Sequence, residues 1–249
     1  MVRLYRALIA AIVAAGLCGS GAAWADSAAE MAAAGKAYDL AALASVQTKL
    51  DAEAGEASDN YGAQRAAAEC YALRASIHRQ DRHIQKLDGK TGEAKRAEQE
   101  RWGTAGMVFA ERALELAKTD EEKAQAHRLI GELYSHLITG MITGMRNGPK
   151  ARKHVESALE LAPKDFECNR AIGIMYLHNP PISGGDIDKA ISTFKMCSAG
   201  DPKNDRYLVL LSMAYRKKGE TNLAADAARQ ALAVNPKNLD ARHLLDVLK

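Results

Sequence analysis

The sequence has few aromatic residues, little net charge and no alternating strand pattern, and these shortages limit the class of protein that it can form. Aromatic residues make up 5% of the 249 positions, whereas alanine is abundant, which suits close packing of helices. The formal charge is +3, or +1 without the two arginines of the first 25 residues, so nothing predicts broad binding of nucleic acid or an anionic membrane. No alternating run rich in Val, Ile and Thr occurs, so the sequence predicts an all-α fold.

Motifs of catalysis and metal binding are also lacking. No two histidines stand four residues apart, as they do in a helical metal-binding pair, and no Gly-x-Ser-x-Gly nucleophile motif is present. Gly184 and Gly185 are not followed by the Lys-Ser/Thr pair of a phosphate-binding loop. We therefore expect a protein that is not an enzyme and that has neither a cofactor nor a metal site.

The N-terminus has the features of a secretory signal peptide. Arg3 and Arg6 precede an apolar stretch, 7–17, that is too short to span a bilayer comfortably. Ala23 and Ala25 then supply small residues at the two positions that a signal peptidase reads. We expect cleavage after Ala25, a periplasmic or secreted mature chain and no membrane insertion after cleavage; a retained membrane anchor is the alternative.

A short proline motif occurs three times, as Pro163-Lys164-Asp165, Pro202-Lys203-Asn204 and Pro236-Lys237-Asn238. Each copy follows one Ala-rich helical pattern and precedes another, and the prolines stand 39 and then 34 residues apart. Helix pairs with a period near 34 residues that close on a proline are typical of tetratricopeptide repeats (TPRs). The chain resembles TPR proteins, which implies a right-handed superhelix of antiparallel helix pairs that offers a binding surface.

The repeat pattern divides the chain into three parts. Residues 1–25 are the expected signal peptide, 26–120 are N-terminal helices with a degenerate TPR-like pair, and 121–249 are three TPR-like repeats with a C-terminal capping helix. Within the degenerate pair, the polar stretch 79–93 predicts a loop.

One repeat carries a doubled Ile-Thr-Gly-Met at 138–145. It predicts that the first helix of this repeat runs past its usual end. Gly140 and Gly144 would then share one helical face, beside a stripe formed by Met141 and Met145. The stripe is expected either to pack internally or to form an exposed contact surface.

The following repeat has five extra residues between its two helices. Two prolines are expected to end the first helix, two glycines to turn the chain, and an aspartate to cap the second helix. These insertion-loop residues are Pro180, Pro181, Gly184, Gly185 and Asp186.

The stretch 156–202 resembles a known transporter component. The residues that carry the resemblance are Ala158-Leu159-Glu160-Leu161-Ala162-Pro163, Gly173, Tyr176, Pro180-Pro181, Gly184-Gly185-Asp186, Lys189-Ala190 and Phe194. On these residues the stretch resembles the T component of tripartite TRAP transporters and, more loosely, regulator-of-microtubule-dynamics proteins. The T component is an all-helical periplasmic protein that assists a substrate-binding subunit, so the resemblance implies export.

Arginines recur on the helix face that lines the concave groove of a TPR superhelix. Arg65, Arg128 and Arg170 occupy the same position in three successive units. Arg65 and Arg128 are each followed four residues later by a glutamate, Glu69 or Glu132. Ile174 stands four residues after Arg170, so we expect the charge of Arg170 to be the least neutralised. Such a ladder predicts a groove for a carboxylate-bearing ligand; ordinary ion pairs on the helix surface are the alternative.

Three cysteines remain after the expected cleavage, an odd number in an oxidising compartment. Cys168 begins one helix and Cys197 lies near the end of its antiparallel partner, so the two are a possible disulfide. Cys70 is expected to be a buried, small apolar residue.

These features together favour an exported, non-enzymatic TPR scaffold that binds a protein or peptide segment in its concave groove. The alternative is a periplasmic accessory subunit, similar to the T component, of a TRAP-type transporter for a small acidic solute. An open groove would favour the first function, and a closed cavity would favour the second.

Overall fold

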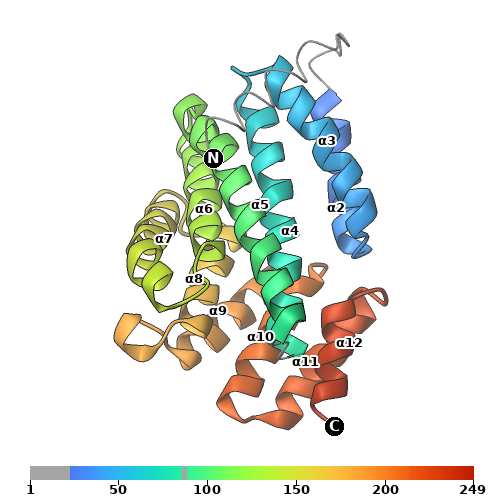
Figure 1. Cartoon of the computed structure of the whole chain (residues 1–249). Coiled ribbons are helices and arrows are strands. Elements are labelled where there is room, and N and C mark those ends of the chain that lie inside the picture. Colours follow the sequence, from blue (N-terminus) through green and yellow to red (C-terminus); the bar gives the residue numbers. More distant parts are fainter. Residues whose placement is uncertain (1–22, 86–88) are drawn as a thin grey trace.

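The computed structural model describes residues 23–85 and 89–249, and within them the chain forms eleven α-helices and no strand (Figure 1). Most of the expected signal peptide lies outside the described residues. The predicted all-α solenoid of helix pairs is confirmed. No helix in the described ranges combines the length and apolar character that a bilayer span requires.

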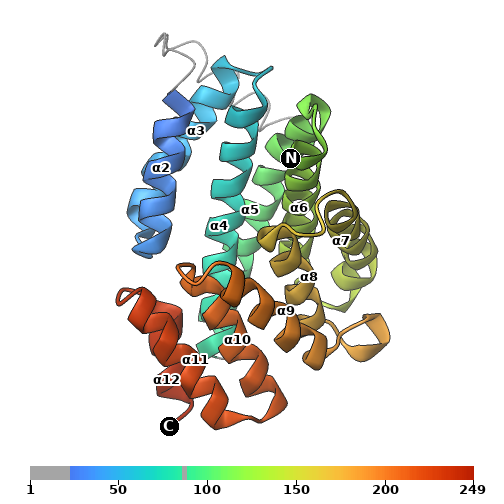
Figure 2. The same cartoon turned by 180° about the vertical axis from the view of Figure 1, so that it is seen from behind.

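Successive helices form antiparallel pairs (Figures 1 and 2). The first two pairs are α2 (Ala23–Lys36) with α3 (Leu40–Glu56), and α4 (Tyr61–Gln85) with α5 (Gly89–Leu116). A 3-10 turn at Pro181–Ser183 interrupts the connection between α8 and α9. The remaining helices are α6 (Asp120–His136), α7 (Met141–Leu161), α8 (Phe166–His178), α9 (Ile187–Gly200), α10 (Asp205–Lys218), α11 (Thr221–Val234) and α12 (Leu239–Val247).

The three proline motifs set the starts of helices. The last residue of each motif, Asp165, Asn204 or Asn238, is the N-cap of α8, α10 or α12. Its side chain accepts a hydrogen bond from a backbone N–H of the first helical turn, which satisfies one of the otherwise unpaired donors there. The preceding helix ends two residues before the proline of the motif, and the next helix begins directly after its Asp or Asn.

The first helix of each pair lines the inside of the superhelix. Along this inner side, α4 contacts α6, α6 contacts α8, α8 contacts α10, and α10 contacts α12. Helix α12 also packs against α4, so these five inner helices close on themselves. The hydrophobic core is continuous along the N-terminal part, where residues of α2 to α5 share one cluster with Leu129, Ile130 and Leu133 of α6.

Polar contacts fasten the N-terminal hairpin to the last repeat. The Tyr38 hydroxyl, in the turn between α2 and α3, lies 3.0 Å from Asn238 Oδ1 and 3.1 Å from Asp240 Oδ2. Asn235 Nδ2 donates to the Lys36 carbonyl oxygen at 3.0 Å. Burial and the nearby Asp240 carboxylate raise the pKa of Tyr38 far above its ordinary value, so the phenol remains a donor. Figure 2 shows α12 beside the lower end of the α2–α3 hairpin.

The prediction of a loop at 79–93 is wrong for the residues that the structure describes. Helix α4 continues to Gln85 and α5 begins at Gly89, which leaves only 86–88 outside the description. The polarity of this stretch comes largely from Arg, Lys, Glu and Gln, which are good helix formers. A polar sequence is therefore compatible with a helix here.

The prediction for 138–145 is also wrong, because α6 ends at His136 and the doubled motif starts the second helix of the pair. Gly140 is the N-cap of α7. The Thr143 hydroxyl oxygen accepts hydrogen bonds from the backbone N–H groups of Thr139 and Gly140, both at 2.9 Å. These bonds satisfy donors at the start of α7 and fix the boundary after Gly140.

Close packing between α6 and α7 depends on Gly131. A Cβ atom there would lie 2.6 Å from Val155 Cγ2 and 3.1 Å from the Ala151 carbonyl oxygen. Because a backbone atom cannot move away like a side-chain tip, we expect Gly131→Ala to lower the free energy of unfolding by about 1 to 3 kcal/mol. Urea denaturation of the purified variant measures this change.

The control for this prediction is Gly144→Ala in α7, where an added Cβ would make only an ordinary contact, 3.6 Å from Ile138 Cγ2. The control should leave stability unchanged or raise it by up to about 1 kcal/mol, since alanine favours helix over glycine. Equal stabilities of Gly131→Ala and wild type would contradict the packing argument.

Candidate functional site

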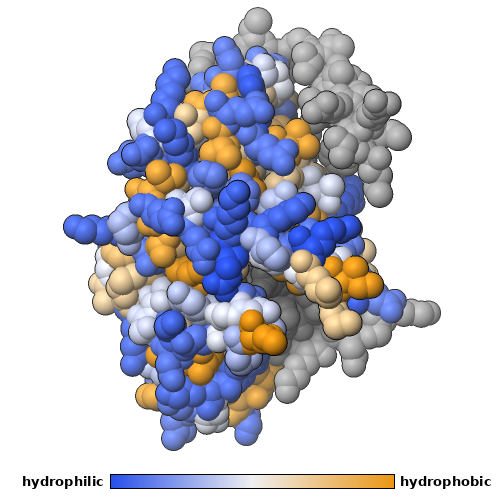
Figure 3. All heavy atoms as spheres, turned by 90° about the vertical axis from the view of Figure 1, so that its left-hand side faces the viewer, coloured by the Kyte–Doolittle hydropathy of each residue, from blue (hydrophilic) through white to orange (hydrophobic). Residues whose placement is uncertain are grey.

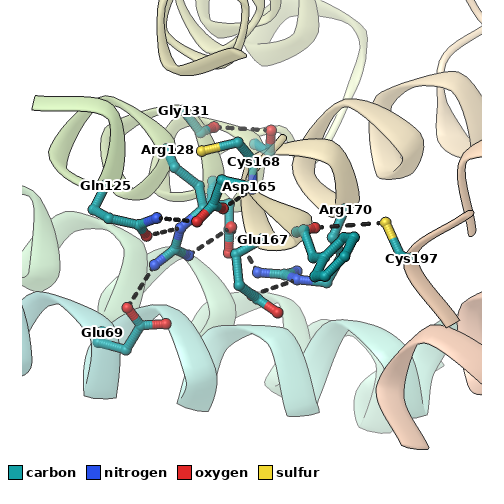
Figure 4. A network of polar contacts seen from close by, with 12 residues as sticks. Glu69, Gln125, Arg128, Gly131, Asp165, Glu167, Cys168, Arg170 and Cys197 are labelled. Atoms are coloured by element: carbon teal, nitrogen blue, oxygen red, sulfur yellow. Dashed lines mark hydrogen bonds and ion pairs between the residues drawn. The ribbon is translucent and has the colours of Figure 1, made fainter. Parts of the chain in front are cut away.

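Alternating arginine and glutamate side chains form a ladder across the inner helices (Figure 4). Arg128 of α6 donates from Nη2 to Glu69 of α4 at 2.6 Å and from Nη1 to Glu132 of its own helix at 2.9 Å. Arg170 of α8 donates from Nη2 to the same Glu132 at 2.7 Å and from Nε to Glu167 at 2.8 Å. The ladder therefore connects three successive repeats through paired charges.

Neutral and weaker contacts extend the ladder at both ends. Tyr207 of α10 donates its hydroxyl hydrogen to Glu167 at 2.7 Å. At the other end, Arg65 Nη1 lies 3.8 Å from Glu69, and this pair is partly exposed. Arg128 also donates from Nε to the side-chain oxygen of Gln125 at 2.8 Å.

The central charges of the ladder are buried and stay ionised. The side chains of Arg128, Arg170 and Glu132 are 2%, 3% and 12% exposed. Burial opposes the ionisation of Glu132, but Arg170 and Arg128 outweigh it and lower its pKa to about 2. Burial likewise opposes the charge of Arg170, yet Glu132 and Glu167 hold its pKa above the ordinary value.

The prediction that Arg170 is the least neutralised arginine is wrong, since two carboxylates pair with it. One comes from the neighbouring helix and the other from the preceding turn, whereas the sequence argument considered only the following turn. Arg65, Arg128 and Arg170 do belong to one connected ladder, but the last two are internal ion pairs and do not offer free guanidinium groups. Ile174, the fourth predicted groove residue, is half-buried one turn after Arg170.

The space beside Arg170 is small. A cavity of about 30 Å³ is bounded by Arg170, Ile174 and Glu132, together with residues of α4 and α10. This volume accommodates a water molecule and not a peptide. The inner face at Arg170 is therefore a packed structural element.

The prediction of a disulfide between Cys168 and Cys197 is also wrong, because both cysteines are free and buried. Cys168 packs against Ala124 of α6 and Ala158 of α7, while the Cys197 sulfur lies 3.6 Å from the Phe166 carbonyl oxygen. The two thiols have different neighbours, as Figure 4 shows. Cys70 is buried and free, and burial raises its pKa to about 12.

The insertion loop has a defined conformation. Helix α8 ends at His178, and Asn179 separates it from Pro180 and Pro181. Gly184 has φ +77°, in the left-handed region that glycine adopts without strain. At Gly185 an added Cβ would lie 1.9 Å from the Asn179 carbonyl oxygen, so the chain passes too closely for any other residue.

Two further contacts hold this loop in place. The Asp186 carboxylate caps α9 by accepting from the N–H groups of Asp188 and Lys189. Arg152 of α7 donates from Nη2 to the Ser183 carbonyl oxygen at 2.7 Å. The loop is thereby fixed against the side of α7.

An outer groove lies between the start of α7 and the insertion loop, with a volume of about 860 Å³. Sequence reasoning left open whether the methionine stripe here is internal or exposed, and in the structure it is exposed. The exposed large apolar side chains that line the groove are Met141, Met145 and Ile182, with 82%, 74% and 97% exposure. The doubled Ile-Thr-Gly-Met was the sequence signal for this surface, although it was assigned to the wrong helix.

Metal ligands do not gather anywhere in the part of the chain that the structure describes. No group of three or more His, Cys, Asp or Glu side chains has the arrangement that a metal ion requires there. His127 and His154 do meet, with 2.9 Å between their Nδ1 atoms. Burial and His127 lower the pKa of His154 to about 4, so the imidazole is neutral at physiological pH.

Comparison with known proteins identifies the fold. No family model matches the sequence, and no curated protein matches it. Among solved structures, the chain is similar to TTC0263, a thermophilic TPR protein of Thermus thermophilus, with a TM-score of 0.62 and 15% identity over 89% of this chain and 98% of that one. It is also similar to YrrB, a TPR protein with an unusual peptide-binding site, at a TM-score of 0.42 and 15% identity over 83% and 84% of the two chains. The likeness to TTC0263 shows that the chain has the TPR fold.

The ladder predicts a large effect of an arginine substitution on stability. In Arg170→Ala, Glu132 loses one of its two charged partners and Glu167 loses the guanidinium that pairs with it. We expect the free energy of unfolding to fall by about 3 to 5 kcal/mol, the range for breaking a buried ion pair. Chemical denaturation checks the value.

Arg229→Ala is the matched control, because Arg229 forms an exposed pair with Asp226 on one helix, at 61% and 55% side-chain exposure. It should change stability by no more than about 0.5 kcal/mol. A similar small change for Arg170→Ala would show that the inner ladder is not structural.

The lowered pKa of Glu132 predicts an acid-dependent loss of stability. Because the folded protein holds this carboxyl ionised down to about pH 2, below its value in the unfolded chain, the stabilisation is present above about pH 4.5 and is lost as pH falls toward 2. We expect Glu132→Gln to be less stable than wild type at about pH 6, but to lose less stability between about pH 6 and 3. Denaturation curves of both proteins at the two pH values measure this, and parallel losses would contradict it.

Proposed function

We propose that this chain is an exported, non-enzymatic TPR scaffold that binds a segment of another protein. The observation that carries this proposal is the group of exposed apolar side chains that line the outer groove, Met141, Met145 and Ile182. Apolar side chains that gather on the surface of a water-soluble domain mark an interaction site. The stacked helix pairs give this surface a rigid support.

The paired arginines argue against a binding surface inside the superhelix, and we propose one on its outside. The inner face at Arg128 and Arg170 is filled by side chains that pair with each other, so a ligand would have to break these pairs to enter. The outer groove needs no such rearrangement, because Met141, Met145 and Ile182 already face solvent. A protein segment that covers them gains the free energy of apolar burial.

The alternative, an accessory subunit for a small acidic solute, calls for a cavity of suitable charge. One cavity of about 390 Å³ lies between the α2–α4 part and the start of α10. Its lining includes the basic residues Lys36, Lys203 and Arg206, but also the acidic residues Glu69, Asp201 and Asp205. This balanced lining gives no preference for an acid, so we place protein binding first.

Affinity purification from the periplasm of the native host tests the proposed function. The tagged mature chain should retain one protein in a stable ratio, and an excess of untagged chain should compete it away. A chain that retains no protein, but whose thermal stability rises with small carboxylates, would instead favour the accessory subunit.

Export gives a separate prediction at the N-terminus. Helix α2 begins at Ala23, and the Trp24 ring lies so close to Gly62 that a Cβ at Gly62 would be 2.5 Å from it. Cleavage after Ala25 removes this tryptophan and leaves α2 from Asp26 onward. We expect N-terminal sequencing of the periplasmic protein to begin at Asp26. Recovery of Met1, or of Trp24 within the mature chain, would contradict the cleavage site.

A further inference from the structure

We propose that the outer groove binds an acidic amphipathic helix of the partner protein. This inference rests on the proposed function and adds the place and the chemical character of the bound segment. Three features of the groove carry it: two fixed walls, an adaptable apolar lining and a basic charge.

The two walls are held at a fixed separation. One wall is the first part of α7, from Met141 to Arg152, and the other is the insertion loop at 178–184 with part of α8 behind it. The Arg152 guanidinium joins them through its hydrogen bond to the Ser183 carbonyl oxygen and also pairs with Glu156 at 3.1 Å. The groove is therefore present before any partner binds, which reduces the entropy lost on binding.

The lining suits an apolar helix face. Met141, Met145 and Met175 line the groove with Ile174 and Ile182. Methionine is unbranched and polarisable, so it adapts to the side chains of a bound helix. Viewed from the side on which α7 lies, hydrophobic areas interrupt a mainly hydrophilic surface (Figure 3).

The charge of the groove lining is basic, through Arg152. Residues 141–155 include four Lys and Arg residues and no Asp or Glu, and no acidic residue lines the groove. Arg146 and Lys153 are exposed on the same part of α7 as the lining residues Met145 and Arg152. A partner helix with acidic residues along its flank complements these cations, which gives the interaction its specificity and orientation.

The dimensions fit a short helix. The wall from Met141 to Arg152 is about 16 Å long at the rise of an α-helix, which matches about three turns of a partner. Such a helix presents apolar side chains at i, i+3 or i+4, and i+7, the spacing used in helix-in-groove recognition. A hollow between two walls favours this shape over the flat surface of a membrane.

A peptide display library tests the proposal even though the partner is unidentified. Random peptides of about 16 residues, enough for four helical turns, are selected on the mature wild-type chain. The proposal expects enriched peptides that combine Asp or Glu with apolar residues at helical spacing. Fluorescence anisotropy then measures the affinity of the enriched peptides for wild type and variants.

Two groove variants and two controls make the test specific. The triple variant Met141→Glu, Met145→Glu, Ile182→Glu should weaken binding at least about tenfold, and Arg146→Glu with Lys153→Glu should weaken it several-fold and reduce its salt dependence. Met196→Glu with Leu223→Glu makes the same apolar-to-acidic change at two other sites, each 46% exposed, and should leave affinity unchanged. Arg229→Glu is the control for charge reversal. Circular dichroism confirms that each variant is folded.

Four outcomes would overturn the inference. Enriched peptides that bind the triple variant with the same affinity as wild type would leave protein binding intact but place it elsewhere. Enriched peptides that are basic would contradict the charge argument. Concentration-dependent dimerisation that the triple variant abolishes would make the groove a self-association surface. Groove-dependent sedimentation with vesicles of anionic phosphatidylglycerol, absent with neutral phosphatidylcholine, would make it a membrane surface. Failure of the proposed function itself is seen separately, when affinity purification retains no partner.

Discussion

One carboxylate oxygen of Glu132 accepts hydrogen bonds from arginines of two successive repeats, and the inner side of the superhelix depends on this shared contact. Taking these charges out of water is costly, and the cost is recovered only while every member keeps its partner. The repeats are therefore joined by a polar network as well as by apolar packing. Because Arg128 and Arg170 are committed to this network, their guanidinium groups contribute to stability and are not free to bind a ligand.

The helical framework could be predicted because its signals are local. The proline motifs lie next to the helices that they start, and Asp165, Asn204 and Asn238 cap those helices within a few residues. The ion-pair ladder could not be predicted in this way. Arg128 and Glu69 are 59 residues apart, and Arg170 and Glu132 are 38 apart, so their pairing is set by the stacking of repeats.

The methionine stripe shows a different limit of sequence reasoning. A period of three to four residues identifies one face of a helix, but it does not say which helix of a pair carries the motif or which face meets solvent. The boundary after Gly140 depends on hydrogen bonds from Thr139 and Gly140 to the Thr143 hydroxyl. Because of these bonds the methionine stripe belongs to the start of α7, where it forms a wall of the outer groove.

The contact of Tyr38 with Asn238 and Asp240 joins residues about 200 positions apart in the chain. An open array of repeats behaves as a one-dimensional system, in which each unit is stabilised by its neighbours and the ends unravel first. Closure removes this independence, because the first hairpin and the last repeat share one interface. Folding then has to bring the two ends together across a long loop, which raises the contact order and slows the reaction relative to an open array. In return, the terminal repeat is held by a second neighbour, so the closed chain is expected to unfold as a single cooperative unit.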